Sequence, residues 1–361
     1  MREGLVEIDG SRGEGGGQIL RTSLALSMIA GRPLVMRNIR AGRAKPGLRR
    51  QHLTCVQAAA QLCNATVRGD RVGSQQLEFT PGPHRTDELE LTIDIGTAGS
   101  TTLVVQTILV PAIVAGRRLR ATVIGGTHNP MAPPFDFLDR VFVPQLRAMG
   151  ADVTLALDRY GFVAGGGGGG RRDFYDAPTA ARGQLVVTVG PGTLRPISIV
   201  EAGPITARHA VAILARLPTH VGDRELGVVR ERLGFAPVEC EIREVSDGGP
   251  ANLLMLEVER GPHTRELVTS FGEQGLRAEL VAARACDELA AFLAAGVPVG
   301  AHLADQLLLP MAVAGGGRFR AAPLSLHATT NIDTIQRFLE LPFRVEPDGD
   351  AVIVTVGSPP G

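Results

Sequence analysis

Apolar residues recur with helical spacing in three stretches of the chain, and each stretch ends at a glycine followed by a strand-like run. These helices are predicted at 18–30, 100–115 and 303–314, before Gly31, Gly116 and Gly315. Glycine favours this position because it readily adopts the left-handed conformation that ends many helices. Second helices are predicted at 47–62, 135–149 and 332–339, with short strands after them, as at 352–356. The pattern predicts three units of strand, helix, strand, helix, strand and strand.

The spacing of these glycines predicts an insertion in the third unit. Gly31 and Gly116 are 85 residues apart, whereas Gly116 and Gly315 are 199 residues apart. The excess of 114 residues has the size of a small domain. We therefore expect a large three-unit domain at 1–200 and 295–361 and an inserted α/β domain at 201–294. A strand at 185–189 is expected to open the third unit. Inside the insert we predict helices at 207–215, 224–233 and 276–293, and strands at 238–244 and 253–258.

Composition and charge narrow the class of protein. Hydrophobic residues make up 44% and charged residues 20%, which is typical of a globular domain and unlike a disordered chain. The 37 basic and 37 acidic side chains cancel, which argues against a protein that coats nucleic acid nonspecifically. No signal peptide, membrane-length apolar stretch or Cys-x-x-Cys pair is visible, and so we expect a cytoplasmic location.

The first candidate for chemistry is the glycine-rich segment at 9–21, DGSRGEGGGQILR, which leads from a strand into a helix. Backbone N–H groups at such a junction bind phosphate, assisted by the helix dipole. It differs from a dinucleotide-binding fingerprint because Gln18 stands where the third glycine belongs. Glu14 suits a divalent ion that accompanies the phosphates. The alternative is a tight turn with a solvated Glu14.

The second candidate is the basic segment at 39–52, IRAGRAKPGLRRQH. Guanidinium groups bind phosphate oxygens in a bidentate manner and stay charged, and so this segment suits a polyphosphate or a nucleic-acid end. A solvated basic surface explains it equally well. A third segment at 125–137, GGTHNPMAPPFDF, combines prolines and aromatics that form either an apolar wall for a nucleobase or a rigid entry to a helix.

The fourth candidate joins HLADQ at 302–306 with SLHATTNID at 325–333. The repeat gives His327 the same topological position as the basic loop of the first unit. We expect His327 in a loop, with Thr329, Thr330 and Asn331 capping the helix that follows. A single histidine in a loop is usually a surface residue, and so both interpretations stay open from the pattern alone.

Taken together, these segments resemble the RNA 3'-terminal phosphate cyclases. The resemblance rests on GEGGGQILR at 13–21, residues 39–47, LADQL at 303–307, and His327 with Thr330-Asn331-Ile332, in one order along the chain. It implies an α/β (α+β) fold of three repeated units resembling the C-terminal domain of translation initiation factor 3, with a small inserted α/β domain.

The resemblance also implies a nucleotidyl-transferring ligase that uses ATP. A histidine, here His327, takes up AMP with release of pyrophosphate and passes it to an RNA 3'-terminal phosphate. The neighbouring 2'-hydroxyl then closes a 2',3'-cyclic phosphate and releases AMP. The expected partners are ATP, a divalent cation (Mg or Mn), an RNA with a 3'-terminal phosphate and, in a homodimer, a second copy of the chain.

The resemblance assigns the remaining roles residue by residue. The metal ligand is Glu14, and the phosphates and RNA are bound by Arg21, Arg40, Arg43, Gln51 and His52. ATP or AMP is bound by Gln106, Pro133, Phe137, His302, Leu303, Ala304, Asp305 and Gln306. His302 stands where bacterial members carry a tyrosine stacked on adenine, and an imidazole stacks over a smaller area.

Two other readings of the sequence remain. Noncatalytic relatives of the cyclases act in ribosome assembly, but they lack the nucleophilic histidine that is present here at His327. An enolpyruvyl transferase has a similar repeat topology, but it has no need of a histidine–AMP adduct.

Overall fold

The same strand order occurs in three four-stranded sheets of this protein. The structure, a computed structural model, describes residues 4–83, 88–162, 182–261 and 264–357. In each sheet the first strand pairs parallel with the second, the second antiparallel with the fourth, and the fourth antiparallel with the third. The mixed α/β fold is thereby confirmed, while the likeness to the initiation factor domain stays a prediction.

Each unit contributes one sheet and two helical segments. The first consists of β1 (Val6–Asp9), α1 (Gly17–Ala30), β2 (Leu34–Arg37), α2 (Arg50–Cys63), β3 (Thr66–Arg68) and β4 (Leu77–Thr80). The second consists of β5 (Leu89–Asp94), α3 (Thr101–Val114), β6 (Leu119–Gly125), a helix made of α4 (Phe135–Phe137), η1 (Leu138–Phe142) and α5 (Val143–Ala148), β7 (Val153–Arg159) and β8 (Gly183–Val189). The third consists of β9 (Ser198–Ile199), α8 (Ala301–Val313), β14 (Gly316–Ala321), α9 (Leu326–Gln336), β15 (Phe343–Asp348) and β16 (Ala351–Gly357).

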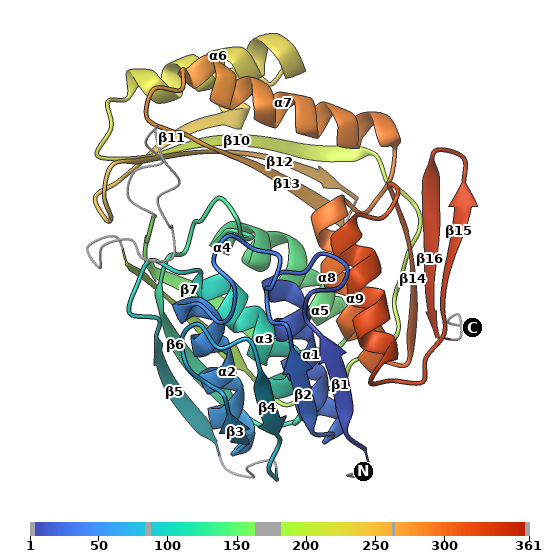
Figure 1. Ribbon diagram of the computed structural model, residues 1–361. Coiled ribbons are helices and arrows are strands. Elements are labelled where there is room, and N and C mark those ends of the chain that lie inside the picture. The colour runs from blue at the N-terminus through green and yellow to red at the C-terminus, as the bar shows by residue number, and fades with distance from the viewer. Residues whose placement is uncertain (1–3, 84–87, 163–181, 262–263, 358–361) are drawn as a thin grey trace.

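The inserted segment forms a fourth sheet between β9 and α8. It consists of β10 (Ile205–Ala215), α6 (His220–Leu233), η4 (Pro237–Glu239), β11 (Cys240–Val245), β12 (Ala251–Arg260), β13 (Thr264–Phe271) and α7 (Ala278–Ala295), with the strand order β11-β10-β12-β13. Helices α6 and α7 cover one face of this sheet, and the other face is turned toward the rest of the chain (Figure 1). The domain boundaries at 201 and 294 stay predictions.

Two predicted elements of the chain are wrong. Residues 207–215 form strand β10 rather than a helix. Its residues 210–215 are all buried, since this central strand is covered on both faces, and the alternation that identifies a strand is therefore absent. Residues 185–189 belong to β8, which pairs with β6 and β7 and closes the second sheet. The short β9 opens the third unit instead, paired in parallel with β14.

A further correction concerns the start of α9. The helix begins at Leu326, because the Ser325 hydroxyl accepts a hydrogen bond from the Ala328 N–H (3.2 Å) and caps it. His327 therefore lies in the first turn of a helix and not in a loop. Thr329, Thr330 and Asn331 are helical residues rather than caps.

Helix α1 is the centre of the large core, where it contacts α2, α3 and α9. Arg21 is its one charged residue, and most of its side chains from Ile19 to Met28 are buried. The first turns of α1 and α9 meet, since a hydrogen bond joins Gln18 to His327. Another joins Gln18 to Asp305 in the second turn of α8. The fold thus brings three helix N-termini to one place (Figure 1).

Candidate active site

A cavity of about 530 Å³ opens where these helix N-termini meet. Its walls come from α1, α3, α8 and α9, from the loop before α4, and from β13 and α7 of the insert. Eight of the predicted site residues line it: Arg21, Gln106, Pro133, Phe137, His302, Asp305, Gln306 and His327. Segments that lie up to three hundred residues apart in the sequence therefore form one site.

His327 is held by a chain of side-chain hydrogen bonds. Its Nδ1 lies 2.7 Å from Oε1 of Gln18, and Nε2 of Gln18 donates to Oδ1 of Asp305 at 2.5 Å. An amide oxygen only accepts, and so Nδ1 of His327 carries the proton. The lone pair of the neutral ring is then on Nε2, which is the atom available for a nucleophilic attack.

Two residues of neighbouring helices complete this chain. Nδ2 of Asn331 donates to Oδ1 of Asp305 (3.0 Å), and Oδ1 of Asn331 accepts from the hydroxyl of Thr22 (3.0 Å). Burial raises the pKa of Asp305, while hydrogen bonds from Gln18 and Asn331 and the nearby Arg21 oppose this shift. The carboxyl group therefore links α1, α8 and α9 at the site.

The helix ends make the cavity attractive to anions. None of α1, α8 and α9 has an acidic residue in its first turn, and so their positive ends are not neutralised there. Arg21 adds a permanent positive charge to the lining. This combination suits the phosphates of a nucleotide.

The glycine-rich loop packs against α9 one turn beyond His327. The Glu14 N–H donates to Oγ1 of Thr330 (3.1 Å). Gly13 has φ +55°, and a Cβ there would lie 2.3 Å from the same oxygen, so that only glycine allows this approach. The loop is therefore fixed next to the nucleophile.

Glu14 itself does not line the cavity. One of its carboxylate oxygens pairs with Arg43, which also donates to the Glu14 carbonyl (3.0 Å). The other, Oε2, is buried without a hydrogen-bond partner among the described residues. A buried, unsatisfied carboxylate oxygen is a suitable ligand for a cation.

No group of three or more His, Cys, Asp or Glu side chains suited to a metal ion occurs within the described residues. A single carboxylate such as Glu14 would hold a divalent ion only together with other ligands, and for Mg²⁺ these are usually phosphate oxygens and waters.

Other predicted residues support the site from outside the cavity. Arg40 is buried, and its Nη1 donates to the carbonyls of Lys45 (2.8 Å) and Gly47 (2.9 Å). Oε1 of Gln51 accepts from the Ser100 N–H (2.9 Å) and so joins the first two units. Leu303 and Ala304 turn their side chains into the core.

His52 is a buried histidine beside the N-terminus of α1. A Cβ at Gly17 would lie 2.5 Å from its Nε2. Burial and the charges of Arg40, Arg21 and Arg49 hold the pKa of His52 well below its usual range. The ring is therefore neutral near pH 7, and it packs against the glycine-rich segment as an uncharged group.

The lining of the cavity also includes apolar and ring side chains. Pro133 and Phe137 form one wall, and the Thr102 hydroxyl fixes the carbonyl of Pro133 (2.7 Å). The His302 ring meets Phe137 edge-on, with centroids 6.3 Å apart and planes at 88°. The exposed side chain of Met131 also lies there.

Sequence reasoning missed Gln18, Thr22 and Asn331. Gln18 served only to reject a dinucleotide fingerprint, and Asn331 was assigned to a helix cap. For Gln18 and Asn331, the signal that could have identified them is their position in the same two strings as Arg21 and His327, each one helical turn from one of those residues. Thr22 lies just outside the first string.

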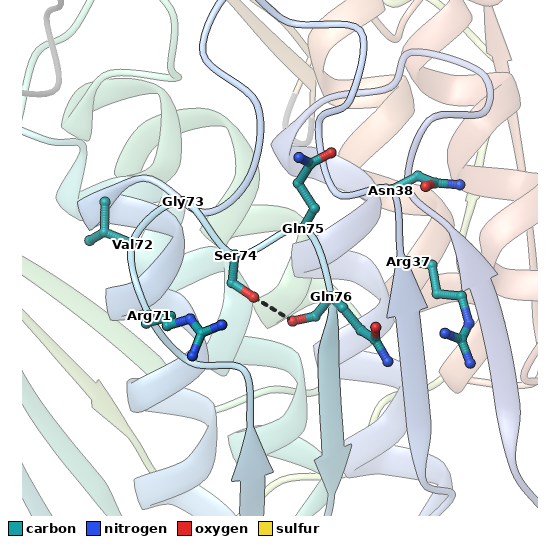
Figure 2. A pocket seen from close by; sticks show the side chains of 8 residues that line it. All are labelled: Arg37, Asn38, Arg71, Val72, Gly73, Ser74, Gln75 and Gln76. Carbon is teal, nitrogen blue, oxygen red and sulfur yellow. Dashed lines mark hydrogen bonds between the residues drawn. The ribbon is translucent and has the colours of Figure 1, made fainter.

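A second cavity, of about 560 Å³, lies over the ends of β2 and β4 (Figure 2). Its lining combines two arginines, Arg37 and Arg71, with polar and small residues: Asn38, Val72, Gly73, Ser74, Gln75 and Gln76. Its lining contains none of the predicted site residues and no carboxylate.

No helix within the described ranges is long and apolar enough to cross a bilayer.

Comparison with known proteins gives one consistent result. The sequence model of the family described as RNA 3'-terminal phosphate cyclase matches residues 12–345. A protein of that name from Ectopseudomonas mendocina (strain ymp) is 45% identical over 344 residues, which cover 94% of each chain. One from Koribacter versatilis (strain Ellin345) is 42% identical over 98% of this chain and 95% of its own. One from Pseudomonas fluorescens is 44% identical over 98% of both.

Proposed function

Because the chain belongs to the RNA 3'-terminal phosphate cyclase family, we propose that it converts an RNA 3'-terminal phosphate to a 2',3'-cyclic phosphodiester at the expense of ATP. The observation that carries the proposal is the His327 ring, whose Nδ1 is bound to Gln18 in a cavity that Arg21, Pro133 and Phe137 also line. The fold and the site together suit a nucleoside triphosphate with its innermost phosphorus at His327.

In the first step, Nε2 of His327 attacks the α-phosphorus of ATP. A P–N bond forms, the bond from the α-phosphorus to the bridging oxygen breaks, and pyrophosphate leaves. Gln18 holds the ring by its Nδ1 proton, so that the positive charge that develops on the imidazole is stabilised by a fixed acceptor and, through it, by Asp305.

In the second step, an oxygen of the RNA 3'-phosphate attacks the same phosphorus, the P–N bond breaks, and AMP is joined to the RNA end through a pyrophosphate linkage. In the third, the neighbouring 2'-hydroxyl attacks the RNA phosphorus, the cyclic ester forms, and AMP leaves. Arg21 and the helix N-termini bind the phosphates and keep them in line. DNA lacks the 2'-hydroxyl, and so the last step requires RNA.

A divalent ion, Mg or Mn, would be held by Glu14 and the phosphates, and it would offset their charge. Arg43 keeps the Glu14 carboxylate next to α9. The homodimer and the cytoplasmic location expected from the sequence stay predictions.

The test is incubation of the protein with α-labelled ATP and a divalent ion. A labelled protein that survives base but not acid, as a phosphoramidate does, is expected for the wild type and absent for His327→Ala. His220→Ala, an exposed histidine of the insert, is the matched control and keeps the label. A label that persists in His327→Ala would refute the nucleophile.

A second assay follows the RNA. With RNA ending in a 3'-phosphate, the end becomes resistant to phosphatase without a change in length. An end that stays sensitive to phosphatase, in a protein that takes up no label, is the outcome expected of a noncatalytic relative.

A further inference from the structure

The inserted segment supplies a wall of the cavity beside His327. Leu267, Thr269 and Phe271 are alternate residues of β13 and face it together, and Glu288 reaches it from α7. These are the cavity's contacts with the insert, and no role has been given to them above. Glu288 is the only ionisable residue among them.

The insert is fixed firmly against α8 at this place. The Glu266 carboxyl on β13 accepts a hydrogen bond from the backbone N–H of Gly300, the residue before α8. A Cβ on Gly300 would lie 2.1 Å from its Oε2, and so the two elements approach as closely as a glycine allows. Burial, with the charge of Glu288, raises the pKa of Glu266 to about 8.

The order of residues along α8 gives the direction of the nucleotide. Asp305 is one hydrogen bond from Gln18, which holds His327, and it therefore lies at the phosphate end. His302 precedes it by three residues and so lies one turn further along the same face, beside Phe137. Nε2 of His302 is 3.9 Å from Oε1 of Glu288. Glu288 is consequently at the end of the cavity where the base would lie.

We propose that Glu288 is a specificity residue, through which the insert selects adenine over guanine by accepting a hydrogen bond from the 6-amino group. A carboxylate only accepts hydrogen bonds. Adenine offers an amino group at this edge, whereas guanine carries the O6 acceptor there, and an oxygen against a carboxylate is repelled. His302, within reach of the same carboxylate, keeps it beside the base. This inference rests on the proposed function, since the α-phosphorus at His327 sets the direction of the nucleotide.

The experiment compares nucleotidylation of the full chain by α-labelled ATP and GTP, measured as kcat/KM for each. In the wild type ATP is preferred. In Glu288→Gln the amide can accept from adenine or donate to O6, and so the ATP-to-GTP ratio falls at least tenfold, as the loss of a charged hydrogen bond implies. Each ratio is measured within one protein, so that a difference in folded fraction cancels. Glu244→Gln, at an exposed glutamate of β11, is the matched control and keeps the wild-type ratio.

The outcomes separate the two proposals. If Glu288→Gln is labelled by ATP with an unchanged ratio, the specificity role is refuted while the cyclase function stands. If the wild type takes up no nucleotide at all, both are refuted.

Discussion

Gln18 of α1 links the His327 imidazole of α9 to Asp305 of α8 through two hydrogen bonds. Its amide oxygen binds the Nδ1 proton of His327, and its amide nitrogen binds Asp305. A residue with only an acceptor would not bind both, because the carboxylate of Asp305 requires a donor. A glutamine meets this requirement at the first turn of α1, whereas a glycine, as in a dinucleotide fingerprint, would leave both groups without their partner.

Replacement of Gln18 by leucine keeps the volume and removes both hydrogen bonds. We expect formation of the protein–AMP adduct to slow by about 10- to 100-fold, because the ring loses its fixed tautomer and orientation. The KM for ATP changes little, since the adenine end of the cavity is intact. Rapid-quench measurement with labelled ATP gives both values. Gln57→Leu, the same change at an exposed position of α2, serves as the control. Equal rates in Gln18→Leu and the control would contradict the positioning role.

The residues that line the cavity were easier to predict than those that hold them. His327, Asp305 and Arg21 have side chains whose chemistry identifies them, and all three line the cavity. Arg40 and Gln51 were predicted from the basic segment at 39–52, yet they bind backbone groups of the protein. A sequence does not distinguish an arginine that binds phosphate from one that binds a carbonyl, because both need the same donors.

Among the elements, the helices that end at a glycine were predicted within a few residues, since each has a stop signal of its own. Strand β10 was not. Its alanine-rich sequence becomes a strand because β12 and β11 pair with it on either side and both of its faces are covered. The start of α9 was missed although the sequence contains its signal. That signal is the capping residue Ser325, three residues before Ala328.

Helix α6 carries a buried acid that makes the insert sensitive to pH. Glu225 is completely buried, and this burial raises its pKa to about 7. Nδ2 of Asn252 donates to its Oε1 (2.8 Å), while its Oε2 and Oδ1 of Asn252 have no partner among the described residues. A proton on Oε2 supplies the donor that Oδ1 of Asn252 lacks. The protein therefore favours the neutral acid.

The sign of the pH effect follows from this. Between pH 4.5 and about 7 the folded chain keeps the Glu225 proton that the unfolded chain releases, and so this contribution to stability falls as pH rises. In Glu225→Gln the amide supplies both hydrogen bonds at every pH. We expect the variant to gain up to about 3 kcal/mol over the wild type between pH 4.5 and pH 8 in urea unfolding. Glu231→Gln, at an exposed position of the same helix, shows no such gain. If the free energy of unfolding changed with pH in the same way in Glu225→Gln and in the wild type, the raised pKa of Glu225 would be contradicted.

At the scale of the whole molecule, three copies of one topology build the core, and the insert between β9 and α8 completes the cavity. Repetition was visible in the sequence because each unit has an apolar helix that ends at a glycine and is followed by a strand. How the insert lies on the core was not visible in the sequence, because it depends on contacts between residues that are far apart along the chain. The main polar contact is Arg140 of η1, which binds both carboxylate oxygens of Glu257 on β12 (2.9 and 2.8 Å).

Glu257 is nearly buried, and burial raises its pKa, opposed by Arg140 and by Arg265 on β13. In Arg140→Gln the Glu257 carboxylate loses Arg140 and keeps its ion pair with Arg265. We therefore expect a loss of about 1–3 kcal/mol, less than for a buried charge left without any partner. The KM for ATP should rise a few-fold, because β13 and α7 line the cavity.

The control for this effect is Arg120→Gln, which breaks an exposed pair with Glu90 (4.0 Å) and should cost less than about 0.5 kcal/mol. The double variant Arg140→Gln with Glu257→Gln removes the unpaired charge, and so its cost in urea unfolding should be smaller than the sum of the single costs. Strict additivity would mean that the two side chains do not act together, and it would contradict a coupled contact between Arg140 and Glu257.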